Sequence, residues 1–240
     1  MGDAVIEETG KREQAKAERR SRIVQAARDL IRETGDTNLS MRMIAKRADV
    51  SLATPYNLFG SKRAVVLAVF EDERDFVVRF SKIKATNAID RLFAAQELAS
   101  SYFTDDPDFY QTIWKALLDT RGTDETGLAT IERLERNSAA WRALIEAAQA
   151  EGLINTSFAS EALERTLSYL ANGVMLSWVM GTLETRHLRA AGALGYAIAL
   201  RGVATGKGIA LLDERIRSFE SLLHDETTPA ASLKQAARGA

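Results

Sequence analysis

Residues 40–62 hold hydroxyl, phenol and ammonium groups at a spacing that suits contact with a phosphate backbone. Ser40 stands at the expected start of a short helix, where its hydroxyl and the free backbone N–H groups can bind an anion. Tyr56 and Lys62 can reach phosphates on either side of a helix inserted into a groove of DNA. The chemistry that these residue types predict is therefore recognition of a nucleic-acid backbone.

Two short helices separated by a tight turn would position these groups. Apolar spacing predicts a helix over 11–34 that stops at Gly35, then helices over 41–48 and 52–58 with a turn at 49–51. This is the geometry of a helix-turn-helix, whose second helix inserts into the major groove and reads base edges or thymine methyl groups with its leading residues. The predicted DNA-binding residues are Ser40, Arg42, Ser51, Leu52, Ala53, Thr54, Tyr56, Asn57 and Lys62.

The distribution of charge favours a nucleic-acid partner that the whole-chain charge conceals. The 240 residues carry 32 Lys and Arg against 33 Asp and Glu, a formal net charge of −1. Residues 10–63 nevertheless hold 13 basic and 6 acidic residues, a net of +7, whereas residues 64–240 hold 19 basic and 24 acidic residues, a net of −5. A basic face is typical of a phosphate-binding surface, although the charge alone favours a solvated helix face.

Composition excludes several other classes of protein. Hydrophobic residues make up 46% of the chain and charged residues 27%, which is typical of a globular protein and of neither a disordered nor a fibrous one. No run of about 18 apolar residues occurs and the first residues differ from a secretory signal, so we expect a cytoplasmic chain without a membrane segment. Because the chain has no cysteine and only two histidines, His187 and His224, we expect no metal and no cofactor.

The N-terminal segment, residues 19 to about 70, resembles the DNA-binding domain of the tetracycline-repressor (TetR/AcrR) family of bacterial transcription regulators. The resemblance is carried, at the family's spacing, by Ile23, Ala26, Ala27, Leu30, Ile31, Gly35, Ile44, Ala45, Ala48, Val50, Ser51, Tyr56, Phe59, Ser61 and Lys62, of which Phe59 is interpreted as core. Asp49 replaces the family's usual glycine, and aspartate tolerates a left-handed turn at modest cost. The resemblance implies a homodimer that binds a palindromic operator and carries a helical domain for ligand binding and dimerisation.

The remainder of the chain is predicted to be all-α. Apolar spacing and helix-start signals predict helices over 61–83, 86–103, 107–119, 124–151, 158–181, 184–204 and 207–224, about nine to ten helices in the whole chain. The predicted domains are a helix-turn-helix domain at 11–62, a ligand-binding and dimerisation domain at 63–224 and a disordered tail at 225–240.

Aromatic and apolar residues of the body predict two further sites. Aromatic residues at helical spacing are either plain core or the lining of an apolar pocket, and helices that are apolar on more than one side are buried either against a second copy or within one protomer. The predicted ligand-binding residues, for a mostly apolar or aromatic effector, are Phe93, Gln96, Phe103, Tyr110, Trp114, Trp141, Asn172 and Met175. The predicted dimer-interface residues are Leu163, Leu167, Leu170, Val174, Trp178, Leu188, Gly192, Gly195 and Ala199.

The leading interpretation is a ligand-responsive transcriptional repressor that acts as a homodimer. A TetR-like activator and a helical protein-interaction adaptor without ligand switching stay open as alternatives. An enzyme is disfavoured, because the acidic pairs at 105–106 and 124–125 are explained as helix-start residues and the glycines at 206 and 208 lack the rest of a phosphate-binding loop.

Overall fold

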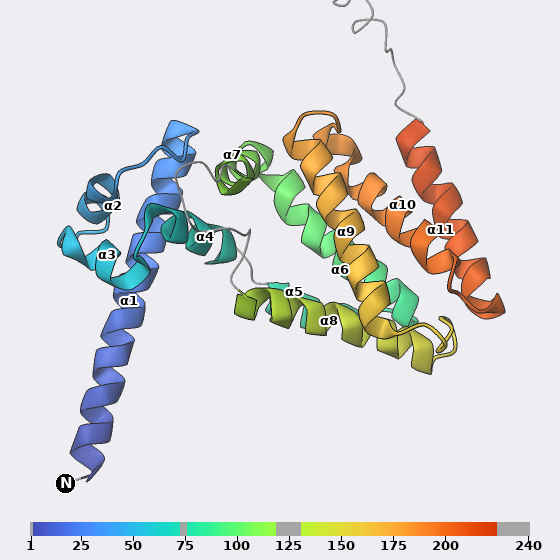
Figure 1. The fold of residues 1–240 in the computed structure, drawn as a ribbon, viewed down its shortest axis with the longest axis horizontal. Helices are drawn as coiled ribbons and strands as arrows, with labels where there is room; N and C mark the ends of the chain where they lie inside the picture. Colours follow the sequence, from blue (N-terminus) through green and yellow to red (C-terminus); the bar gives the residue numbers. More distant parts are fainter. Residues whose placement is uncertain (1, 73–75, 119–130, 225–240) are drawn as a thin grey trace, which may run out of the picture. The chain divides into compact units, whose positions relative to one another are not determined.

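The computed structural model describes residues 2–72, 76–118 and 131–224, and over these ranges it consists of helices and connecting loops (Figure 1). The elements are α1 (Gly2–Thr34), α2 (Met41–Arg47), α3 (Ala53–Phe59), α4 (Lys62–Asp72), α5 (Phe76–Ser81), α6 (Ala88–Asp105), α7 (Pro107–Leu118), α8 (Ile131–Ala150), α9 (Ser160–Val179), a 3-10 turn (Thr185–His187), α10 (Leu188–Arg201) and α11 (Gly206–His224). The all-α prediction is confirmed over these ranges. The predicted tail at 225–240 lies outside the described residues.

The chain divides into two compact units whose boundary differs from the predicted one at residue 62. The first unit comprises Met1–Val77 and Asp106–Thr130, and the second comprises Val78–Asp105 and Ile131–Ala240. The first unit thus includes α4 and α7. These two helices are joined by aromatic contacts, since the Phe70 ring of α4 meets the rings of Tyr110 and Trp114 of α7 edge-on, with centroids 6.4 Å and 5.6 Å apart. The apolar spacing of α7 shows that one face is buried, but it does not show which unit buries that face.

The helix-turn-helix forms through short-range contacts that its sequence predicts. The Ser40 hydroxyl accepts the backbone N–H of Met43 at 3.1 Å and so caps α2. Asp49 adopts a φ of +52°, and the N–H of Val50 donates to the carbonyl of Ala45 at 3.1 Å, which closes the turn before α3. Gly35 likewise has a φ of +64° directly after α1. The expected caps and the expected left-handed turn are confirmed.

The predicted helices over 61–83 and 11–34 compare differently with those observed. The first corresponds to α4 and α5, which lie on either side of residues 73–75, a segment outside the described residues. Helix α1 begins at Gly2 and not near Lys11. The acidic residues near its start favour a helix, because negative charge stabilises a helix N-terminus.

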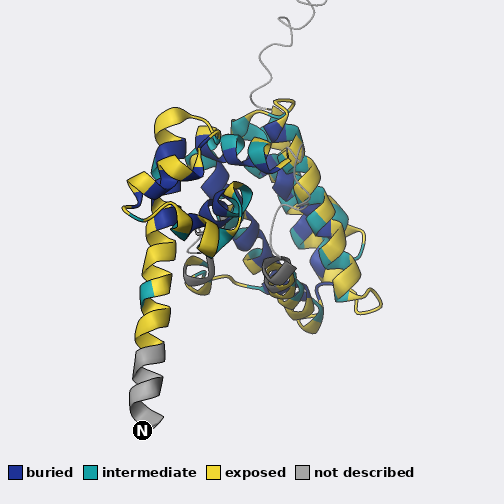
Figure 2. Ribbon diagram, turned by 60° about the vertical axis from the view of Figure 1, so that its left-hand side comes forward, coloured by how far each residue is buried: buried dark blue, intermediate teal, exposed yellow. Residues whose placement is uncertain are grey.

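Helices α6, α8, α9, α10 and α11 build the second unit around one apolar interior (Figure 2). Its fully buried side chains include Ile89, Leu92, Ile145, Trp178 and Leu200. The loop after α8 is joined to the loop after α10, since the N–H of Asn155 donates to the carbonyl of Val203 at 2.9 Å and the N–H of Thr205 donates to that of Leu153 at 3.0 Å. No helix in the described ranges has the length and apolar character needed to cross a membrane.

Candidate nucleic-acid interface

Helix α3 is anchored on one side and exposed on the other. Pro55 is buried, and the Arg20 guanidinium of α1 lies over the Phe59 ring, 4.1 Å from its centroid. Arg20 also donates from Nη1 to the carbonyl oxygen of Leu58 at 3.0 Å. In contrast, Leu52, which precedes α3, is 47% exposed, and Tyr56 of α3 is 51% exposed. A short helix held from behind with an exposed polar and apolar face can enter a DNA groove without unfolding its support.

The structure brings all nine predicted DNA-binding residues into the first unit. Ser51, Leu52, Ala53, Tyr56 and Asn57 are exposed on and just before α3. The others lie at helix starts or are less exposed: Ser40 and Arg42 at the start of α2, Lys62 as the first residue of α4, and Thr54 half-buried with its hydroxyl 2.8 Å from that of Ser51.

Two arginines near the interface have roles that sequence reasoning missed. Arg20 supports α3 across 38 positions of sequence, which no local pattern indicates. Phe59, interpreted as core from the sequence, is only half-buried, and the Arg20 guanidinium covers its ring. Arg47 donates from Nη1 to Oε1 of Glu33 at 2.9 Å, and this hydrogen bond lowers the pKa of the Glu33 carboxyl. Arg47 is therefore partly neutralised, while Arg42, Lys46 and Lys62 stand exposed on the same unit.

The predicted ligand-binding residues are distributed over both units. Tyr110 and Trp114 lie in the first unit, where they pack against Phe70. The others belong to the second unit, with Asn172 exposed and Met175 half-buried on α9.

The aromatic members of this second group contact separate partners. Phe93 meets Phe219 with ring centroids 5.7 Å apart, Phe103 meets Trp178 at 6.1 Å, and Trp141 meets Tyr196 at 5.9 Å. Each aromatic residue thus contributes to the packing of the unit's helices.

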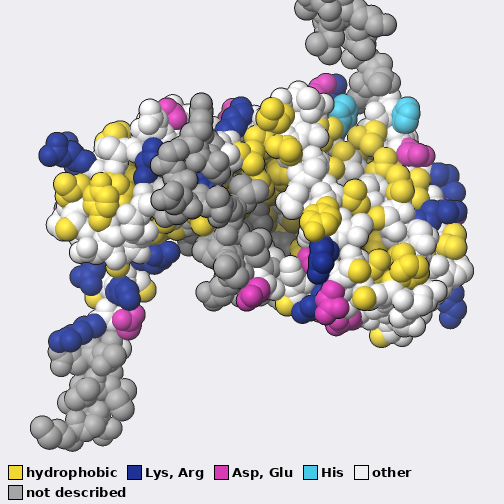
Figure 3. All heavy atoms as spheres, in the orientation of Figure 1, with side chains coloured by type: hydrophobic (Ala, Val, Ile, Leu, Met, Phe, Trp, Pro, Cys, Tyr) yellow, Lys and Arg dark blue, Asp and Glu magenta, His cyan; other side chains and the backbone are white. Residues whose placement is uncertain are grey.

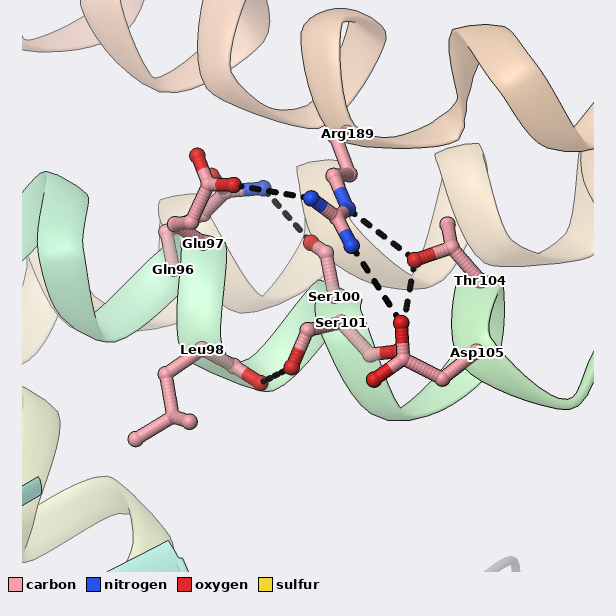
Figure 4. A network of polar contacts seen from close by, with 8 residues as sticks. All are labelled: Gln96, Glu97, Leu98, Ser100, Ser101, Thr104, Asp105 and Arg189. Carbon is pink, nitrogen blue, oxygen red and sulfur yellow. Dashed lines mark hydrogen bonds and ion pairs between the residues drawn. The ribbon is translucent and has the colours of Figure 1, made fainter. Parts of the chain in front are cut away.

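A polar network joins α6 to α10 inside the second unit (Figure 4). Arg189 of α10 donates to Thr104 Oγ1 at 3.0 Å, to Glu97 Oε1 at 3.0 Å and to Asp105 Oδ1 at 3.4 Å. Beside it, the buried Gln96 donates to Ser100 Oγ at 2.9 Å. A Cβ added at Gly192 would lie 2.8 Å from Gln96 Nε2. Gly192, predicted for the dimer interface, thus makes room for Gln96 within one protomer.

The predicted dimer-interface residues divide between the interior and the surface of the second unit. Leu167, Trp178, Leu188 and Gly192 are buried within it, and Leu163, Leu170, Val174, Gly195 and Ala199 are half-buried.

The surface of α9 and α10 carries exposed apolar side chains beyond those predicted. Tyr169 is 68% exposed and Met180 is 70% exposed, and Leu176 and Ile198 are also exposed. An open groove of about 450 Å³ lies here, lined by Tyr169 and neighbouring residues.

Known proteins similar to this chain share its fold. Residues 23–69 match the family model described as bacterial regulatory proteins, tetR family. A TetR transcription regulator from Haloarcula marismortui matches with a TM-score of 0.61 and 18% identity, covering 79% of this chain and 100% of that chain. A comparison with curated protein sequences finds no significant match.

Two further similar structures are those of repressors. SmeT, the repressor of the Stenotrophomonas maltophilia multidrug efflux pump SmeDEF, has a TM-score of 0.57 and 20% identity, covering 78% of this chain and 91% of that chain. FadR of Thermus thermophilus, in complex with lauroyl-CoA, has a TM-score of 0.58 and 22% identity, covering 76% of this chain and 94% of that chain. At these identities the likeness concerns the fold.

Proposed function

We propose that this chain, which belongs to the tetR family of bacterial regulatory proteins, is a transcriptional regulator that binds operator DNA through α3. The observation that carries the proposal is the exposed face of α3, supported from behind by Pro55 and Arg20 within the segment that matches the family. Ser51, Leu52 and Ala53 would meet base edges, and Tyr56 and Lys62 would meet phosphates.

Salt-dependent DNA binding tests this function. With a duplex selected by the wild-type chain from a random pool, Tyr56→Ala and Lys62→Ala are each expected to weaken binding about equally for all sequences. Lys62→Ala is also expected to reduce the slope of log K against log salt concentration by about 1 for each bound protomer, because each loses one phosphate contact. Gel shifts at several salt concentrations give both quantities. A wild-type chain without salt-sensitive DNA binding would contradict the proposal.

We further propose that the regulator is a homodimer joined through α9 and α10. The exposed apolar residues Tyr169, Leu176 and Met180 on α9 support this, together with Ile198 on α10. A second copy would cover these side chains by forming a four-helix bundle with α9 and α10 of the first. Two copies would also place two recognition helices on a palindromic operator.

A charge placed in this apolar surface tests the dimer. Leu176→Asp is expected to halve the mass measured by light scattering, since an aspartate buried against a second copy has no counter-charge. Leu222→Asp is the matched control, because Leu222 is exposed on α11 and its replacement is expected to leave the dimer intact. A wild-type monomer, or a dimer that survives Leu176→Asp, would show that another surface or no surface is used.

We propose that a mostly apolar or aromatic effector acts on the second unit and releases the operator, and that the chain is a repressor. The aromatic residues of the unit and the buried Gln96–Ser100 pair support such a ligand, since binding sites combine apolar walls with few polar groups. A ligand changes operator affinity only by its differential affinity for the two conformations. A compound that binds tightly and leaves operator affinity unchanged would therefore not be the effector.

A further inference from the structure

The N-terminal part of α1 has no role in the core of the first unit. The first buried side chain of α1 in the described residues is Ile23, and residues 10–22 are exposed apart from the half-buried Ala15. In Figures 1 and 2 this part of the helix projects beyond α2, α3 and α4 of its own unit. At about 1.5 Å per residue, residues 2–22 extend roughly 30 Å. A helix that is polar on all sides gains nothing from burial, so its length calls for another explanation.

Basic residues occupy one side of this extension. At about 3.6 residues per turn, the six basic side chains fall within one half of the helix circumference, while Glu13 and Glu18 fall in the other half. The six are Lys11, Arg12, Lys16, Arg19, Arg20 and Arg22. Figure 3 shows Lys and Arg side chains along this part of the surface. The sorting of charge makes a basic stripe along residues 11–22, and Lys16 of the stripe also forms an exposed ion pair with Glu13 at 3.7 Å.

The stripe is continuous with the recognition helix. Arg20 lies at one edge of the basic half, and it is the residue that contacts Leu58 and Phe59 at the end of α3. Lys16 and Arg12 follow on the same side at one and two turns beyond Arg20. When α3 lies in the major groove, the anionic surface nearest to this side of the first unit is the phosphate backbone that borders the groove.

We propose that the basic half of residues 11–22 is a second DNA-binding element, which contacts the phosphate backbone flanking the site read by α3. The proposal rests on the function proposed above and adds a surface outside the helix-turn-helix. The contact is independent of base sequence, because Lys and Arg meet phosphate oxygens and not base edges. It lengthens the duplex that one protomer needs for full affinity, and it steepens the salt dependence of binding.

A triple variant, Arg12→Ala with Lys16→Ala and Arg19→Ala, tests the second element. The selected operator is offered as a duplex limited to the recognised site and as one extended by about ten base pairs on each flank. Wild type is expected to bind the extended duplex more tightly, whereas the triple variant is expected to bind both lengths equally. For the dimer its slope of log K against log salt concentration should be about 5 smaller, at about 0.9 for each of the three phosphate contacts that each protomer loses.

The matched control removes the same charge from the second unit. Arg165, Lys207 and Arg217 are exposed there, and their replacement by alanine is expected to leave both the slope and the preference for the long duplex unchanged. Alanine is a strong helix former, so circular dichroism should show α1 intact in the test variant.

Three outcomes would overturn the inference. If the test variant equals wild type in slope and length preference while Lys62→Ala still lowers the slope, α3 binds DNA and the extension does not. If the control triple changes binding as much as the test triple, the effect is one of net charge. If wild type shows no salt-sensitive binding, both the inference and the proposed function fail.

Discussion

Replacing Gly208 with alanine is expected to destabilise the second unit by about 3 kcal/mol or more, near the upper end for overpacking of a core. An added Cβ would lie 2.1 Å from the carbonyl oxygen of Leu153 and 3.2 Å from the Cβ of Ala204. Leu153 cannot move away easily, because the same oxygen accepts the N–H of Thr205 and the next residue pairs with Ala204. Thermal unfolding should show a midpoint roughly 10 °C lower.

Gly206→Ala is the control for this substitution. Gly206 lies two residues earlier in α11, and a Cβ added there meets no atom within 4 Å. Its replacement should change stability by no more than about 0.5 kcal/mol. Equal stability of the two variants would mean that the loops after α8 and α10 are not held as closely as the structure describes.

The largest functional effect is expected from Ala53→Glu at the first residue of α3. Ala53 is exposed, and a glutamate in the first turn suits the helix dipole, so the fold should keep its stability. If α3 enters the major groove, the new carboxylate stands among phosphates and base edges without a cation. We expect operator affinity to fall at least about 100-fold, measured by fluorescence anisotropy at fixed salt.

Ala53→Gln separates the effect of charge from the effect of size. Glutamine has nearly the shape of glutamate and no charge, so its loss of affinity should be clearly smaller. If Ala53→Glu binds the operator as tightly as wild type does, the N-terminal end of α3 does not contact DNA, and the proposed interface is wrong.

Sequence patterns predicted the parts of the fold that form over a few residues. The cap of α2 by Ser40 and the left-handed turns at Gly35 and Asp49 each depend on neighbours within about five positions. The spacing of apolar residues along a helix is also a short-range property, since it repeats every three or four positions. The all-α class and most helix bounds therefore agree with the structure.

Contacts between distant segments could not be predicted in this way. The support of α3 by Arg20 and the assignment of α7 to the first unit depend on which faces meet in three dimensions. Gly192 illustrates the limit, because a small residue indicates a close approach without naming the partner. The sequence favoured a second copy, whereas the structure places the side chain of Gln96 there.

The first unit is not continuous along the chain. It is formed by Met1–Val77 and Asp106–Thr130, so the chain enters the second unit at Val78, within α5, and returns to the first at Asp106, directly before α7. During synthesis the ribosome therefore delivers the whole helix-turn-helix before Tyr110 and Trp114, the residues that cover Phe70. A fragment cut after α4 would keep α3 and expose Phe70, the side chain that Tyr110 and Trp114 of α7 cover. The first unit is complete only when part of the segment that follows α6 has been made.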